Sequence, residues 1–368
     1  MVSAPADRLA ADGLADAAGS VGRRLARPLI ALAVLAVLAL VAIAVSTMIG
    51  SVQVGWTDLM HYLTGGRTGD PTNTVLLREI RIPRVVTAAA VGAGLGIAGL
   101  LMQTIFANPL ADPYILGVSS GASLGVALVT LGTGTVSTGF VALVGGARVG
   151  VMVAAAIGAA AVLLLILLLG RWVRSVITLL ITGVMVSSAV GAITSLLLAF
   201  ADPTRLQRYV MWGLGSYSGV TRHDLPIMVV VILFGIVLSG LLVRSLNAML
   251  LGEHYARSMG VPVRAVRVVA MIATAVIAGA VTAYCGPIAF LGIAVPHLAR
   301  LVIGSSDHRL LMPASILTGV AVSCLCSVLA QLPGDDAVLP INVTTALVGA
   351  PVVVAVLLRS RRLAAGAV

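Results

Sequence analysis

Ten long apolar stretches are spread along this chain, and they leave little room for a water-soluble fold. They fall at residues 29–49, 85–106, 114–132, 149–169, 176–200, 225–243, 266–283, 286–303, 311–330 and 341–358. A helix that crosses a bilayer needs about 20 predominantly apolar residues. Only 10% of the residues are charged, whereas a soluble domain usually has about 25%. The sequence therefore predicts an all-α integral membrane protein with about ten transmembrane helices.

The apolar stretches divide the chain into one membrane domain and two short tails. Residues 1–28, rich in alanine, are expected to form a mobile cytoplasmic tail, and residues 363–368 a C-terminal tail. Residues 29–362 are expected to form the ten-helix membrane domain. The first apolar run is longer than the apolar core of a signal peptide, which has about 7–15 residues. We therefore interpret it as an uncleaved first span.

Arginine sets the predicted orientation in the membrane. All 23 basic residues are arginine, and the formal net charge is +10. With both termini inside, fifteen arginines lie at inner ends of the spans and eight at outer ends. Inner loops usually carry the excess of positive charge, so both termini are expected in the cytoplasm. The arginines are scattered and form no aromatic-interleaved patch, which argues against a nucleic-acid partner.

The residue types that usually carry chemistry are missing from the middle of the predicted spans or do not have the spacing of a site. None of the 13 acidic residues falls in the middle of a predicted span, where ion-coupled carriers usually place carboxylates. Without lysine the chain has no P-loop, so any driving ATP must be hydrolysed by another subunit. The five histidines and three cysteines show no metal-site or redox spacing. We expect no catalytic residue, metal ligand or cofactor in this chain.

Glycine recurs on one face of the second predicted span, at Gly92, Gly96 and Gly99. Small residues spaced in this way let two helix backbones approach closely in lipid. We interpret them as a helix-packing face.

Residues 108–117 form an unusual connection on the predicted cytoplasmic side. The sequence Asn-Pro-Leu-Ala-Asp-Pro-Tyr-Ile-Leu-Gly holds two prolines and ends at Gly117. Proline and glycine at these positions predict a rigid turn between two spans.

Residues 250–261 are amphipathic and also lie on the predicted cytoplasmic side. Glu253 and Arg257 are spaced for an ion pair on one helix face, and Gly260 stands just before Pro262. This pattern predicts a short helix with a glycine C-cap. From the residues alone, an interfacial helix and a docking surface for a cytoplasmic partner both remain open.

In combination, the motifs of this chain resemble those of the FecCD family, the permease subunits of ABC importers for iron-siderophores, haem and vitamin B12. The resemblance extends from about residue 29 to about residue 362. It is carried by Ile80-Arg81-Ile82-Pro83-Arg84, Asn108-Pro109-Leu110-Ala111-Asp112-Pro113, Leu116-Gly117-Val118-Ser119-Ser120-Gly121-Ala122, Leu251-Gly252-Glu253 with Ala256, Arg257 and Gly260, Phe290-Leu291-Gly292-Ile293-Ala294-Val295-Pro296-His297 with Arg300, and Leu347-Val348-Gly349-Ala350-Pro351.

The resemblance implies a BtuC-like bundle of the type II ABC importer class in a bacterial cytoplasmic membrane. It implies that the chain is a permease and not an enzyme, and that it pairs with a second FecCD-type subunit as a homodimer or heterodimer. Two cytoplasmic ATPase subunits, which would hold ATP and magnesium, and an extracytoplasmic binding protein are the other implied partners. The main alternative from the residues is an ion-coupled secondary transporter.

The resemblance also implies roles for individual residues. The ATPase-coupling helix comprises Leu250, Leu251, Gly252, Glu253, Ala256, Arg257, Met259, Gly260 and Val261. Docking of the binding protein falls to Arg81 and Arg84, with snorkelling at the membrane interface as their other interpretation. The structural turns of the family motifs comprise Asn108, Pro109, Asp112, Pro113, Gly117, Pro296, His297 and Arg300.

The chain departs from the family pattern near its end. Ser327, Gln331, Val338 and Asn342 stand where the family often has aspartate, arginine, glutamate and glycine. Together with the acidic pair Asp335 and Asp336, these changes favour a heteromeric partner, with the homodimer as the open alternative.

Overall fold

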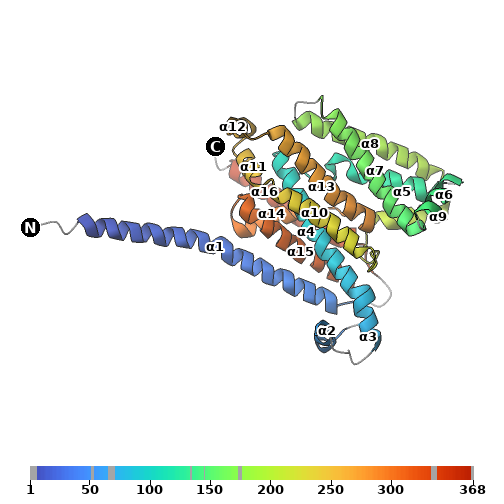
Figure 1. Ribbon diagram of the computed structural model, residues 1–368, viewed down its shortest axis with the longest axis horizontal. Helices are drawn as coiled ribbons and strands as arrows, with labels where there is room; N and C mark the ends of the chain where they lie inside the picture. Colours follow the sequence, from blue (N-terminus) through green and yellow to red (C-terminus); the bar gives the residue numbers. More distant parts are fainter. Residues whose placement is uncertain are drawn as a thin grey trace, which may run out of the picture.

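The computed structural model describes residues 6–50, 54–64, 71–132, 135–144, 146–172, 176–332 and 338–365. Its described part is helical without a strand, which confirms the all-α prediction. The helices pack into one bundle, with α1 at its edge (Figure 1). They are α1 (Ala6–Met48), α2 (Trp56–Leu63), α3 (Pro71–Val75), the π-helical η1 (Leu76–Arg81), α4 (Ile82–Ile105), the 3-10 turn η2 (Pro113–Leu116), α5 (Val118–Thr130), α6 (Thr135–Leu143), α7 (Ala147–Leu169), α8 (Val176–Ala199), α9 (Pro203–Gly213), α10 (Leu225–Gly240), α11 (Val243–Met249), α12 (Glu253–Ser258), α13 (Val263–Cys285), α14 (Leu291–Ile303), α15 (His308–Leu329) and α16 (Ile341–Ala365).

Each predicted apolar stretch contains a helix, but the helices differ in length. In the described residues, six are long and apolar enough to cross a bilayer: Arg27–Met48, Thr72–Ile105, Ala147–Leu169, Ile177–Ala199, Val263–Cys285 and His308–Leu329. The pair α10 and α11, bent by 54°, supplies a seventh. The other three stretches hold shorter apolar helices: α5, α14 and the apolar part of α16. At 13 residues, α5 and α14 are about 20 Å long and do not cross a 30 Å hydrocarbon layer at right angles.

The first helix begins earlier than the predicted boundary at residue 28. α1 starts at Ala6 and runs on through Pro28 without a break. Its first half is rich in alanine and leucine, which are strong helix formers, and Figure 1 shows this half extending beyond the bundle. The tail is therefore helical from Ala6 onward, and its mobility stays a prediction.

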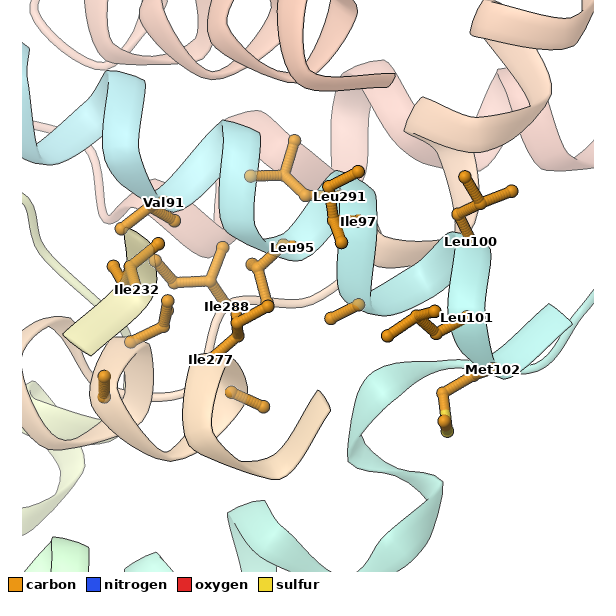
Figure 2. Close-up of a cluster of buried hydrophobic side chains, with 14 of the residues drawn as sticks. Val91, Leu95, Ile97, Leu100, Leu101, Met102, Ile232, Ile277, Ile288 and Leu291 are labelled. Carbon is orange, nitrogen blue, oxygen red and sulfur yellow. The ribbon is translucent and has the colours of Figure 1, made fainter. Parts of the chain in front are cut away.

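α4 is the central helix of the bundle. Within the span that contains it, 83% of the most apolar window is buried, against 17% for α1 and 22% for α8. It packs against α10, α13, α14 and α15. Figure 2 shows Leu95 and Ile97 of α4 in the cluster that includes Ile232 of α10 and Ile277 of α13. The exposed face of α8 is left for lipid or for another subunit.

The glycine face of α4 lies where this helix makes close backbone contact with its neighbours. A Cβ on Gly92 would collide with the carbonyl group of Gly319 in α15, and one on Gly99 with that of Gly292 in α14. A Cβ on Gly96 would meet the adjoining part of α15. Such backbone contact lets van der Waals packing hold helices together in lipid, and the packing interpretation of these glycines is confirmed.

Candidate functional site

The turn after α4 is built from side chains that bond to nearby backbone. Asn108 Oδ1 accepts from the Leu110 N–H at 2.9 Å, and Asp112 Oδ1 accepts from the Tyr114 N–H at 2.8 Å. Gly117 then adopts φ 69°, a left-handed conformation that favours glycine. These three residues close the turn between α4 and α5.

The Pro296-His297 motif packs directly against this turn, although 188 residues separate the bonded pair. His297 Nε2 lies 2.8 Å from the carbonyl oxygen of Pro109. A Cβ on Gly292 would collide with the ring of Pro113. The structure thus brings the two proline-containing motifs together into one joint, which includes α14 with its internal Pro296.

Arg300 fastens the same joint to the end of α4. Its Nη1 donates to Gln103 Oε1 at 2.7 Å, and Gln103 Nε2 donates to the Ile293 carbonyl at 3.2 Å. The motif arginine is therefore held by a neighbouring side chain inside the bundle.

Asp112 carries an electrostatic cost within the joint. Burial raises the pKa of its carboxyl group to about 6, and the hydrogen bond from the Tyr114 N–H counters only part of this rise. The carboxylate form is thus disfavoured where the turn packs against α14.

α12 ends in a well-defined glycine stop. The Gly260 N–H donates to the Arg257 carbonyl at 2.9 Å, and the Val261 N–H donates to the Ala256 carbonyl at 3.1 Å. With Gly260 at φ 80°, these bonds form a Schellman motif. The predicted glycine C-cap is present.

The helix itself is shorter than the predicted amphipathic segment. It covers only Glu253–Ser258, because Gly252 at φ 104° separates it from the preceding turn. Glu253 Oε1 lies 2.5 Å from Arg257 Nη2 and 3.1 Å from Arg267 Nη2. The first contact is the predicted pair on one helix face, and the second joins α12 to α13.

An uncovered apolar surface surrounds α12. We call it the α12 surface: Leu250, Leu251, Tyr255 and Met259, which are 48%, 65%, 59% and 49% exposed. Ala256 faces inward and is fully buried. Tyr255 is not among the residues predicted for the coupling helix, although its spacing from Met259 places both on one side of a helix.

Arg81 and Arg84 are buried, contrary to the expectation that they stand on the outer surface. Their exposed fractions are 2% and 8%. Arg81 donates to the Ile49 carbonyl, and Arg84 Nε donates to Ser327 Oγ at 3.2 Å. A guanidinium group buried in this way does not reach an external protein in this conformation. Their docking role stays a prediction that the burial does not support.

Other arginines at this end of the bundle are exposed. Arg148 pairs with Asp224 at 2.6 Å, and Arg222 pairs with Glu79 at 3.5 Å. Both side chains are nearly half exposed, at 46% and 48%. Loop sequence alone does not rank arginines by exposure, since burial depends on which helices pack over them.

The residues that depart from the family pattern have structural contacts here. Gln331 Nε2 donates to the Ser327 carbonyl at 2.9 Å. Asn342 Nδ2 donates to the Pro287 carbonyl at 2.7 Å, and its Oδ1 accepts from the Ala289 N–H at 3.0 Å. Asp335 and Asp336 lie outside the described residues.

Two further carboxylates cap the starts of helices α9 and α15. Asp202 accepts from the Thr204 N–H and Asp307 from the Arg309 N–H, each at 2.9 Å. Within the described ranges, no three histidine, cysteine or acidic side chains come together as a metal site. The free cysteines Cys285, Cys324 and Cys326 are buried.

Comparison with known proteins agrees with this architecture. The model of the FecCD transport family matches residues 35–359. The vitamin B12 import system permease protein BtuC of Shigella boydii is 34% identical over 331 residues, which cover 89% of this chain and 94% of the relative. The ABC transporter permease protein YvrB of Bacillus subtilis is 38% identical over 305 residues, covering 82% and 84%.

A solved structure gives the same result at the level of the fold. It is an inward-facing conformation of a metal-chelate type ABC transporter, whose sequence is 27% identical to this chain. The two structures superpose with a TM-score of 0.77 over 89% of this chain and 98% of the other. The resemblance drawn from the motifs is therefore confirmed. The chain belongs to the FecCD transport family and is a multi-pass membrane permease of the ABC transporter class.

Proposed function

We propose that this chain forms the translocation pathway of an ATP-driven importer for a metal chelate or corrinoid, such as an iron-siderophore, haem or vitamin B12. The observation that carries the proposal is the α12 surface, in a chain that matches the family over residues 35–359. An exposed apolar patch on a helix with a fixed end is suited to a protein partner. The proposed partner is a cytoplasmic ATPase subunit, which binds and hydrolyses ATP with magnesium.

The proposed mechanism is alternating access. Closure of two ATPase subunits moves α12, and the contact between Glu253 and Arg267 carries this movement to α13. α13 packs against α4, α7 and α10. A shift near the start of α13 is therefore transmitted to these three helices. The substrate passes between this chain and a second permease subunit, for which the exposed face of α8 offers a surface.

The proposed location is a bacterial cytoplasmic membrane. In the proposed orientation, α12 and both chain ends lie in the cytoplasm. An extracytoplasmic binding protein then delivers substrate at the opposite end, where Arg148 and Arg222 are exposed. This end also holds a cavity of about 560 Å³, whose mostly apolar lining includes the polar side chains of Arg148, Arg205, Arg208 and Trp212. All four side chains are hydrogen-bond donors only, which suits an acceptor-rich substrate.

The rival function is ion-coupled secondary transport. It requires a polar ion site at membrane depth. Asp202 and Asp307 instead cap the starts of α9 and α15, and Asp224 lies directly before α10. This placement favours the ATP-driven proposal.

Reconstitution in proteoliposomes tests the proposal. The chain is assembled with the ATPase and binding protein encoded beside it, and uptake of cyanocobalamin and of ferric siderophores is measured. We expect uptake only with ATP on the ATPase side and binding protein on the other. Uptake by the chain alone under a sodium or proton gradient would establish the rival function.

A further inference from the structure

A basic cavity lies beside α12, at the same end of the bundle. It has a volume of about 510 Å³, and four arginines line it with a single carboxylate, that of Glu253. Four guanidinium groups and one carboxylate leave a net charge of +3 inside one small space. We call this the α7–α13 cavity, because Arg171 follows the end of α7 while Arg264 and Arg267 lie in the first turns of α13.

The carboxylate does not neutralise the cavity. Glu253 contacts Arg257 and Arg267, while Arg264 Nη2 donates to the backbone carbonyl of Arg171 at 3.4 Å. In the described residues, the side chains of Arg171 and Arg264 have no acidic partner. In addition, Arg267 Nε is buried without an acceptor. A buried donor without a partner is energetically costly, and an anion in the cavity would supply the missing acceptor.

The backbone adds to the positive potential. The start of a helix carries a partial positive charge, which disfavours cations in its first turns. Arg264 and Arg267 nevertheless occupy the first turns of α13. A bound anion would remove this repulsion.

The position of the cavity identifies the source of the anion. Trp172, next to Arg171 in sequence, is 77% exposed, and exposed tryptophan next to a span is typical of the lipid headgroup level. Apolar side chains on the lipid-facing side of α7 continue from the cavity wall: Leu164, Leu165 and Leu168 are 58%, 43% and 38% exposed. A ligand with an anionic head at the cavity and an apolar chain along α7 fits both features.

We propose that the α7–α13 cavity binds the phosphate group of an anionic phospholipid, with Arg171, Arg264 and Arg267 as its ligands. Basic pockets between helices at a membrane face are typical sites for such headgroups. Arg267, one of the proposed ligands, is also the ion-pair partner of Glu253. The lipid therefore lies directly beside the contact that joins α12 to α13.

The test measures lipid retention, which does not depend on transport. Full-length protein is extracted from membranes that contain equal amounts of phosphatidylglycerol and phosphatidylcholine, and retained lipids are quantified by mass spectrometry. We expect the wild type to retain phosphatidylglycerol selectively. Substitution of Arg171→Gln with Arg264→Gln should reduce this retention roughly 30-fold, because each arginine near the membrane surface contributes about fivefold.

The matched control is Arg244→Gln with Arg309→Gln, which removes equal charge at the same end of the bundle but outside the cavity. Retention by the control should equal the wild type, and size-exclusion profiles should show that both variants fold. Equal loss in both variants, or none in either, would overturn the proposal. Stabilisation of the wild type by inorganic phosphate, without any lipid preference, would also overturn it, since the cavity would then bind a soluble anion. Loss of ATPase binding by the cavity variant, with unchanged lipid retention, would instead assign the cavity to the partner subunit and would overturn the proposal as well.

Discussion

The Nε2 atom of His297 lies 2.8 Å from the carbonyl oxygen of Pro109, and this contact joins two motifs separated by 188 residues. A carbonyl oxygen only accepts hydrogen bonds, so Nε2 carries the proton in this pair. The contact ties α14 to the turn that follows α4. The joint lies on the proposed cytoplasmic side, where the bundle must transmit movement from α12.

Loss of this hydrogen bond should loosen the joint. We expect His297→Ala to lower the midpoint of thermal unfolding by about 2–4 °C, because a net hydrogen bond contributes about 1 kcal/mol. His297→Gln keeps a donor on a side chain of similar reach and should recover part of the loss. Light-scattering or fluorescence melts in detergent measure both variants. Equal melting of His297→Ala and the wild type would contradict a structural role.

Close contact between α4 and α14 should make Gly99 intolerant of any side chain. A Cβ there would overlap the backbone carbonyl of Gly292, so the two helices would have to separate. We expect Gly99→Ala to lower the yield of folded protein and the melting temperature by several degrees, from about 1–3 kcal/mol of overpacking.

Gly240 is the matched control for that substitution. It lies in α10, and a Cβ on it would meet no atom within 4 Å. Gly240→Ala should therefore be neutral or slightly stabilising, since alanine is the better helix former. If both variants behave alike, the close contact at Gly99 does not limit packing.

Asp112 should make stability depend on pH with a definite sign. Its carboxyl pKa is about 6 in the folded protein, against an ordinary value of 3.8. The folded state therefore holds the proton more tightly, so stability is greatest below the unfolded pKa and falls as pH rises from about 4 to 6. Asp112→Asn keeps an oxygen acceptor for the Tyr114 N–H but does not titrate. We expect it to melt roughly 2–5 °C above the wild type at pH 7 and to lose this advantage near pH 4.

Asp307 serves as the control because its pKa is shifted the other way. The hydrogen bond from the Arg309 N–H is the main cause that lowers the pKa of the Asp307 carboxyl group. The stability that the ionised Asp307 contributes is fully present above the pKa of the unfolded state. It disappears only as the pH falls through the lower pKa of the folded state. Asp307→Asn should thus show a constant offset from the wild type between pH 5 and 7. An offset from the wild type that changes with pH for Asp307→Asn, or one that stays constant between pH 4 and 7 for Asp112→Asn, would contradict the assignment.

Arg84 should respond to the residue at position 327. Its buried guanidinium group depends on Ser327, through the hydroxyl at 3.2 Å and the backbone carbonyl at 3.4 Å. Ser327→Ala removes one acceptor from a charged donor and should cost about 1.5 kcal/mol. Ser327→Asp introduces the aspartate of the family pattern as a charged partner. We expect it to melt above Ser327→Asn, which has the same shape without the charge, and the reverse order would show that burying the carboxylate costs more than the ion pair returns.

Gly260 tests the role of α12 in ATPase coupling. At φ 80° it has open space around it, so valine there would strain the backbone without a steric clash elsewhere. A non-glycine residue in this conformation costs about 1–2 kcal/mol. We expect Gly260→Val to insert normally into the membrane but to lose ATPase stimulation and transport. Gly260→Asn, which tolerates the left-handed conformation, should retain most of both, and normal transport by the valine variant would argue against coupling through α12.

The sequence alone determined the class of this protein, because that depends on properties of continuous segments. Ten apolar stretches, the arginine bias and the family motifs required no knowledge of which residues touch. The Gly260 C-cap and the Glu253–Arg257 pair were also predictable, since both are formed by residues within one turn of each other.

Tertiary structure decided everything that depends on neighbours distant in sequence. In the sequence, Arg81 and Arg84 look like surface residues of an outer segment, but packing against residue 49 and residue 327 buries them. The basic cavity likewise appears only when the end of α7 meets the start of α13. The physical reason is that hydrophobicity and local hydrogen bonding act along the chain, whereas burial and electrostatic environment arise from helices that meet only in the folded bundle.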